Sequence, residues 1–135
     1  MIGHEASIPI ITDTDIVTAR QSARELAKNI GFSSSELAGI AAAISELARN
    51  IVSYAEKGMI YIRLIQESNK KGVLVIAEDK GPGISDINKA LQDGYSTSNS
   101  LGLGLPGVQR LMDSFEIQSE IGKGTTVTIK KWAYE

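Results

Sequence analysis

Two helices are predicted in the first half of the chain, because apolar residues recur there at alternating steps of three and four positions. The first stripe lies in "DIVTARQSARELAKNIG", stops at Gly31, and comprises Ile16, Ala19, Ala23, Leu26 and Ile30. A capping box, Ser33-x-x-Glu36, begins the second helix, which continues to about Ala55. Its apolar stripe consists of Leu37, Ile40, Ala41, Ile44, Leu47, Ala48 and Ile51.

The remaining apolar segments are typical of strands. Residues 6–11, "ASIPII", favour an edge strand, because Pro9 cannot donate a ladder hydrogen bond. "MIYIRLI", residues 59–65, alternates as a half-buried strand does. "GVLVIAED", residues 72–79, is an almost continuous apolar run, which is typical of a central strand. The polar "ESNKKG" between these two runs favours an antiparallel hairpin.

The last third of the chain predicts a helix and a second hairpin. A short helical patch is expected near residues 87–91, and "PGVQRLMD" predicts a helix over 106–113. "SFEIQSEI" and "TTVTIKKW" predict strands that flank the turn Gly122-Lys123-Gly124. Helices that come first and mostly antiparallel strands that follow predict an α/β fold. We expect a two-layer sandwich with helices on one face of a mixed, mostly antiparallel sheet.

Length and charge narrow the class of protein. The 135 residues fit a single domain over 1–135. The net charge is −2 and no Lys/Arg cluster exceeds a pair, which argues against nucleic acid as a partner. The chain has no cysteine, its start lacks the pattern of a signal peptide, and no stretch approaches the roughly 20 apolar residues of a membrane span. We therefore expect a soluble cytoplasmic domain with no membrane partner.

The second helix has an unusual polar side. Glu46 points almost directly away from the apolar stripe, and Asn50 follows one turn later on the same side. The rest of this side is small and consists of Gly39, Ala42, Ala43 and Ser53. A solvated helix face is usually rich in Lys and Glu. Two interpretations therefore stay open, a solvated face or a face that another group approaches closely.

Three glycine-containing motifs follow in the second half. Asp79-x-Gly81-x-Gly83 ends the predicted central strand. A carboxylate there can accept the exocyclic amino group of adenine, and glycines let backbone pass close to a base. An ordinary turn after a strand is the alternative interpretation. Another of the three motifs is the turn at 122–124, which Thr125 and Thr126 follow. Threonines in a strand are also explained by β-propensity alone.

The motif Gly102-x-Gly104-x-x-Gly107 has the spacing of a dinucleotide fingerprint, but that fingerprint needs a strand immediately before it. The preceding "DGYSTSNS" is too polar for a buried strand. The protein-kinase glycine loop is also excluded, because its companion motifs are absent from the chain. Glycines that lead into a helix can instead present backbone N–H groups to phosphates.

Taken in order, these motifs resemble the N, G1, G2 and G3 boxes of the GHKL ATPase/kinase superfamily, and the resemblance covers essentially the whole chain. Within it, "DIVTARQSARELAKNIGFS", "AISELARNIVSYAEKG", "AEDKGPGISDINKALQDGYSTS" and "GLPGVQRLMD" are similar to the small bacterial serine kinases of partner-switching pathways, the switch kinases of the stressosome. The resemblance implies the Bergerat ATP-binding fold.

The resemblance also implies roles for individual residues. Asn50 would bind Mg²⁺ through its side-chain oxygen, Glu46 would act as general base, and Asp79 would accept the adenine amino group. Gly81 and Gly83 would lie beside the base, and Thr125 or Thr126 would complete the adenine pocket. Residues 84–101 would form the ATP lid. The backbone around the triphosphate would come from Gly102, Leu103, Gly104, Leu105 and Gly107.

The function that the resemblance implies is phosphorylation of a protein serine or threonine with ATP and Mg²⁺. The substrate would be a STAS-domain antagonist, and the released kinase would bind and activate a serine phosphatase in a stress response. One alternative is an anti-sigma factor kinase with a sigma factor as partner. The other is a non-catalytic binding module whose nucleotide controls partner choice.

Overall fold

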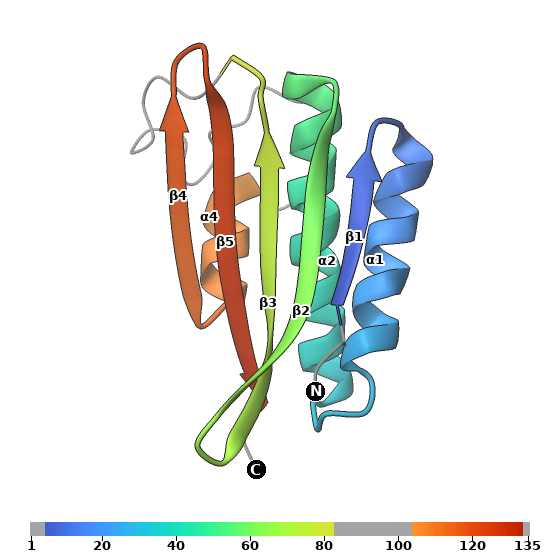
Figure 1. The fold of residues 1–135 in the computed structure, drawn as a ribbon. Helices are drawn as coiled ribbons and strands as arrows, with labels where there is room; N and C mark the ends of the chain where they lie inside the picture. The colour runs from blue at the N-terminus through green and yellow to red at the C-terminus, as the bar shows by residue number, and fades with distance from the viewer. Residues whose placement is uncertain (1–4, 83–103, 134–135) are drawn as a thin grey trace.

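The protein is a two-layer sandwich, in which helices cover one face of a five-stranded sheet (Figure 1). The computed structural model describes residues 5–82 and 104–133. The strands are β1 (Glu5–Ile10), β2 (Gly58–Glu67), β3 (Lys70–Asp79), β4 (Ser114–Glu120) and β5 (Gly124–Ala133). The helices are α1 (Asp13–Ala27), α2 (Ser34–Asn50), the π-helical turn η1 (Ile51–Ala55) and α4 (Gly104–Leu111). The predicted fold class is confirmed.

The strand order is β1-β2-β3-β5-β4, and every pair of neighbours is antiparallel. The predicted sheet was mixed, but among the described strands no parallel pair occurs. β3 lies at the centre, as its apolar run predicted. Pro9 lies in β1 at the edge of the sheet, where its missing N–H leaves no gap in a central ladder. The helical patch predicted near 87–91 lies outside the described residues.

Local sequence signals set the helix ends. Asp15 Oδ2 accepts hydrogen bonds from the backbone N–H of Thr12 at 2.9 Å and of Ile11 at 2.8 Å. These two bonds hold the pKa of the Asp15 carboxyl below its usual value, and the bond from Thr12 has the larger effect. The capping box of α2 forms as predicted, because Glu36 N–H donates to Ser33 Oγ at 3.1 Å and Ser33 N–H donates to Glu36 Oε1 at 2.8 Å.

The core lies between the sheet and the helices. α2 contributes Ile40, Ile44 and Leu47, and small residues on α1 let that helix pack closely against α2. The largest fully buried side chains of the sheet are Ile10, Ile60, Ile62, Val73, Val75 and Ile129. Full burial of such a side chain contributes about 1.5–3 kcal/mol relative to exposure. None of the helices within 5–82 and 104–133 is long and apolar enough to cross a membrane.

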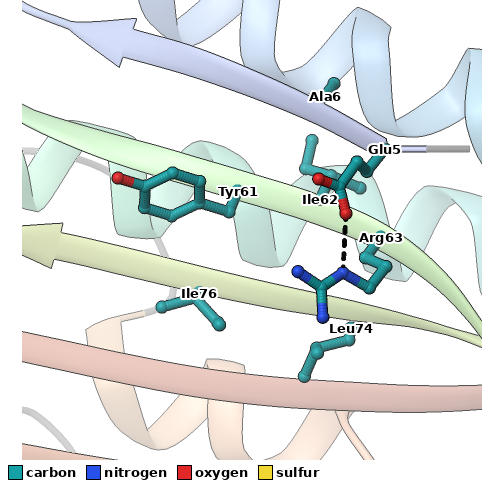
Figure 2. A pocket seen from close by; sticks show the side chains of 7 residues that line it. All are labelled: Glu5, Ala6, Tyr61, Ile62, Arg63, Leu74 and Ile76. Carbon is teal, nitrogen blue, oxygen red and sulfur yellow. Dashed lines mark hydrogen bonds and ion pairs between the residues drawn. The ribbon is translucent and has the colours of Figure 1, made fainter. Parts of the chain in front are cut away.

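A pocket lies beside β1, β2 and β3 (Figure 2). Its lining includes Tyr61, Leu74 and Ile76, and an ion pair of 2.8 Å joins Arg63 Nε to Glu5 Oε2 beside them. None of the predicted site residues lines this pocket. The predicted site residues Glu46, Asn50 and Asp79 lie elsewhere, on α2 and at the end of β3.

Candidate functional site

The C-terminal ends of α2 and β3 lie at the same end of the sandwich, together with the starts of β2 and β5 (Figure 1). The antiparallel register explains why the three strand ends meet there, because Asp79 is paired with Gly58 on one side and with Thr125 on the other. A Cβ added to Gly58 would lie 3.0 Å from Ile51 Cγ2 and 3.1 Å from Asp79 Cβ. Gly58 therefore lies close both to the end of β3 and to Ile51, the residue that follows α2.

Asp79 is half-buried at this end of the sheet. Its Oδ1 accepts a hydrogen bond from Gly81 N–H at 2.9 Å. An ionised carboxylate offers about four lone-pair sites on two oxygens, so this single bond leaves Oδ2 able to accept another donor. The bond from Gly81 thus orients the Asp79 carboxylate, and Oδ2 can still accept a hydrogen bond from a ligand.

Gly81 is a glycine for a reason that the sequence did not show. A Cβ at this position would lie 2.6 Å from Ala55 Cβ and 2.8 Å from Ala55 Cα, so any larger residue would require the backbone to shift. The close backbone approach at Gly81 is therefore made to η1 of the protein itself. It holds the segment after Asp79 against the C-terminal end of the α2–η1 helix. Gly83, the other glycine of this motif, lies outside the described residues.

Glu46 is buried on α2, and only 4% of its side chain is exposed. Its Oε1 accepts a hydrogen bond from Arg49 Nη1 at 3.1 Å. Ala43, one turn earlier on the same side, is also fully buried. Around Glu46 this side of α2 is therefore covered and not solvated, whereas Ser53 at its far end is exposed.

Asn50 lies one turn beyond Glu46 and is half-buried. Its amide oxygen is a ligand type that Mg²⁺ accepts, and Mg²⁺ usually takes only one or two protein ligands and completes its shell with phosphates and water. Across the described parts of the chain, no group of three or more His, Cys, Asp or Glu side chains could hold a metal ion.

α4 packs against α2 and runs in the opposite direction (Figure 1). A Cβ on Gly39 would lie 3.5 Å from Leu111 Cδ2, so the end of α4 is beside the start of α2. Gly104 precedes Leu111 by seven residues and Glu46 follows Gly39 by seven, about 10 Å along each helix axis. The N-terminus of α4 therefore lies near the turn of α2 that carries Glu46.

The N-terminus of α4 begins with Gly104 at φ +70°, a conformation that glycine adopts without strain. Leu105 and Gly107 follow and are buried, and Leu105 packs into the core. The free N–H groups and positive dipole end of this first turn can bind phosphate. Gly102, Leu103 and the predicted lid at 84–101 lie outside the described residues.

The register separates the two threonines that the sequence left as alternatives. Residues directly opposite in a ladder share a face, so Thr125 lies on the face of Asp79 and Thr126 on the face of Glu78. Asp79 shares the parity of Val75 and Ala77, which face the helices. Thr125 Oγ1 is also 2.7 Å from Ser119 Oγ on β4, a partner that the motifs did not indicate. Of the two, Thr125 is on the helix side.

Gly124 ties the β4–β5 hairpin to the end of β3. It has φ +105°, and a Cβ there would overlap the carbonyl oxygen of Asp79 and lie 2.7 Å from Lys80 Cα. Gly122 is a matched control, because its φ of +81° is also positive but nothing lies within 4 Å of its Cβ position.

We expect Gly124→Ala to lower the free energy of unfolding by more than Gly122→Ala does. Both variants incur about 1–2 kcal/mol for a left-handed alanine, and only Gly124→Ala adds a clash with β3. Urea denaturation of both variants measures the difference. Equal losses would show that the contact with Asp79 is relieved at no cost.

Comparisons with known proteins identify the family of this chain. Residues 11–131 match the histidine kinase-like ATPase domain family. Over 128 residues the chain is 52% identical to the serine/threonine-protein kinase RsbT of Bacillus subtilis, which covers 95% of this chain and 96% of that protein. It is 37% identical over 103 residues to an anti-sigma F factor of Caldanaerobacter subterraneus subsp. tengcongensis, an alignment that covers 72% of this chain and 71% of that protein.

Two solved structures share the fold. One contains the RsbU and RsbW domains of a Mycobacterium tuberculosis protein, with a TM-score of 0.64 and 21% identity. It covers 96% of this chain, which spans 33% of that longer one. The other is the mycobacterial sensor histidine kinase MprB, with a TM-score of 0.56 and 18% identity. The match covers 94% of this chain and 97% of that one. The predicted resemblance is confirmed: the chain belongs to the histidine kinase-like ATPase domain family, the GHKL superfamily, and is a serine/threonine protein kinase of it.

Proposed function

We propose that this kinase transfers the γ-phosphoryl group of ATP to a serine or threonine of a STAS-domain antagonist in a cytoplasmic partner-switching pathway. Once released from the antagonist, it binds and activates a serine phosphatase. The observation that carries the catalytic part is the buried Glu46, one turn before Asn50, the last residue of α2. The C-terminal ends of α2 and β3 lie at the same end of the sandwich (Figure 1). The 52% identity to RsbT over almost the whole chain supports the pathway.

The nucleotide fits this end of the fold in one orientation. Adenine donates its amino group to Asp79 Oδ2, because Gly81 N–H already occupies Oδ1. Thr125 completes the adenine pocket, since it shares the face of Asp79 and Thr126 does not. The phosphates then reach the N-terminus of α4, where Gly104, Leu105 and Gly107 offer backbone N–H groups.

Phosphoryl transfer needs mainly positioning of the reactants and neutralisation of charge, so few side chains have to take part directly. Mg²⁺ held by Asn50 would neutralise charge on the phosphates. Glu46 takes the proton from the attacking hydroxyl, the hydroxyl oxygen forms the new bond to the γ-phosphorus, and the bond to the β,γ-bridging oxygen breaks. ADP leaves, and the proton on Glu46 returns to solvent.

The test is incubation of the chain with γ-labelled Mg-ATP and the STAS-domain proteins of its own genome, followed by mass spectrometry of the labelled protein. We expect one STAS-domain protein to gain one phosphate on Ser or Thr, and the phosphorylated form to release the kinase. ATP binding without label on any STAS-domain protein would favour the binding module and overturn the proposal.

The second candidate is an anti-sigma factor kinase, which the 37% identity to an anti-sigma F factor favours. Pull-down with the purified chain separates the two candidates. Retention of a serine phosphatase supports the first, whereas retention of a sigma factor in an ATP-dependent manner supports the second.

Asn50→Ala is expected to raise the Mg²⁺ concentration needed for half-maximal transfer by at least about 10-fold, because loss of even an outer-shell partner of a metal ligand typically costs about 10–100-fold in metal affinity. The reason is the loss of the one protein oxygen assigned to the metal. Titration of Mg²⁺ at fixed ATP measures the shift. Asn69→Ala, which removes an exposed amide in the β2–β3 turn, is the control. An unchanged Mg²⁺ requirement in Asn50→Ala would remove Asn50 from this role.

A further inference from the structure

The ion pair between Glu46 and Arg49 joins a buried carboxylate to a partly exposed guanidinium. Only 4% of the Glu46 side chain is exposed, against 34% for Arg49. A buried carboxylate is costly unless a partner compensates for its lost hydration. Within residues 5–82 and 104–133, Arg49 Nη1 is the partner that the structure gives to this carboxylate, at 3.1 Å.

A second ion pair with the same spacing shows that burial, not spacing, distinguishes the pair of Glu46 and Arg49. Glu25 and Lys28 on α1 are also three residues apart, and their charged atoms lie 2.8 Å from each other. Both of those side chains are exposed, at 72% for Glu25 and 52% for Lys28. Exposed pairs of this kind contribute little because solvent screens them. Glu25 and Lys28 therefore offer a matched control.

The guanidinium contacts only one oxygen of the Glu46 carboxylate. Oε1 accepts a charge-assisted hydrogen bond from Arg49 Nη1, and this bond favours the rotation of the carboxylate that keeps Oε1 toward the guanidinium. Oε2 is then the oxygen left to receive a proton from a substrate hydroxyl. A base that must come within hydrogen-bond reach of that hydroxyl gains from such a fixed orientation.

We propose that Arg49 is a positioning residue, which orients the Glu46 carboxylate so that Oε2 faces the hydroxyl of the substrate protein. This inference rests on the proposed function of Glu46 as general base. In this role Arg49 would contact neither the nucleotide nor the hydroxyl. Its effect on the reaction passes entirely through Glu46.

The kinetic test is a double-mutant cycle with Arg49→Ala, Glu46→Gln and the combined variant, and the acceptor is the STAS-domain protein that the wild-type chain labels. We expect Arg49→Ala to lower kcat by about 10²-fold, as misplacement by about 1 Å can do, with KM for ATP changed by less than about threefold. In the Glu46→Gln background, Arg49→Ala should cost nothing further. Arg49→Lys should recover part of the rate, and Lys28→Ala should leave it unchanged.

The outcomes separate this inference from the proposed function. If Glu46→Gln transfers at the wild-type rate, the assignment of the base fails. If Glu46→Gln is slow but Arg49→Ala is not, only the positioning role fails. An equal loss from Arg49→Ala in both backgrounds would also overturn it, because Arg49 would then act independently of Glu46.

Thermal unfolding tests the pair without any substrate. We expect Arg49→Ala to lower Tm by several degrees, because it leaves a buried carboxylate without its partner. In the Glu46→Gln background the fall should be much smaller. Equal falls in both backgrounds would show that Arg49 does not compensate Glu46, and would overturn the inference even if no acceptor protein is labelled.

Discussion

Asp79→Asn is expected to weaken ATP binding by about 10–150-fold, which corresponds to the 1.5–3 kcal/mol of a hydrogen bond to a charged group. The physical reason is the number of acceptors. Aspartate has two oxygens, one for Gly81 N–H at 2.9 Å and one for the adenine amino group. Asparagine has one oxygen, so its NH₂ group must face either Gly81 N–H or the adenine amino group. One donor is opposed to another donor in both orientations.

Isothermal titration calorimetry with ATP measures this loss, and thermal unfolding shows whether the variant is folded. Glu78→Gln is the matched control, because Glu78 precedes Asp79 on β3 and lies on the opposite face of the sheet. We expect its ATP affinity to equal that of the wild-type chain. A folded Asp79→Asn variant with wild-type affinity would exclude Asp79 from the adenine site.

Glu46→Gln is expected to slow phosphoryl transfer by about 10²–10⁴-fold and to leave ATP affinity unchanged. Glutamine has nearly the same shape, so it preserves the packing of this buried side chain, but it cannot take a proton from the substrate hydroxyl. Single-turnover transfer to the labelled STAS-domain protein measures the rate, and calorimetry measures the affinity.

The control for the loss of a carboxylate is Glu25→Gln on α1, where the side chain is exposed and its ion pair with Lys28 contributes little. This variant should transfer at the wild-type rate. Equal rates for Glu46→Gln and the wild-type chain would contradict the role of general base. A parallel loss of ATP affinity in Glu46→Gln would instead indicate that the carboxylate shapes the nucleotide pocket.

Features that depend on near neighbours in the chain were predictable. The capping box at Ser33 and Glu36 forms as expected, because both of its hydrogen bonds join residues three apart. The stripes of α1 and α2 predicted their helices for the same reason. Pro9 predicted an edge strand from a property of its own backbone, and β1 is at the edge.

The candidate site was predictable only in part. The spacing of Glu46 and Asn50 placed them on one side of a helix, but it did not decide whether that side was solvated. Their burial depends on packing from other parts of the fold. The pair with Arg49 had a signal in the sequence, since Glu and Arg three apart on a helix can interact. Its importance depends on burial, which no local pattern shows.

The sequence by itself determined which segments are helices or strands, where α2 begins, and which residue types stand in the four motifs. Only the tertiary structure decided that β5 enters between β3 and β4, that Thr125 and not Thr126 shares the face of Asp79, and that Gly81 must pass against Ala55. The physical reason is range. Helix and turn signals act between residues a few positions apart, whereas strand order, register and burial arise from contacts between segments that are distant along the chain.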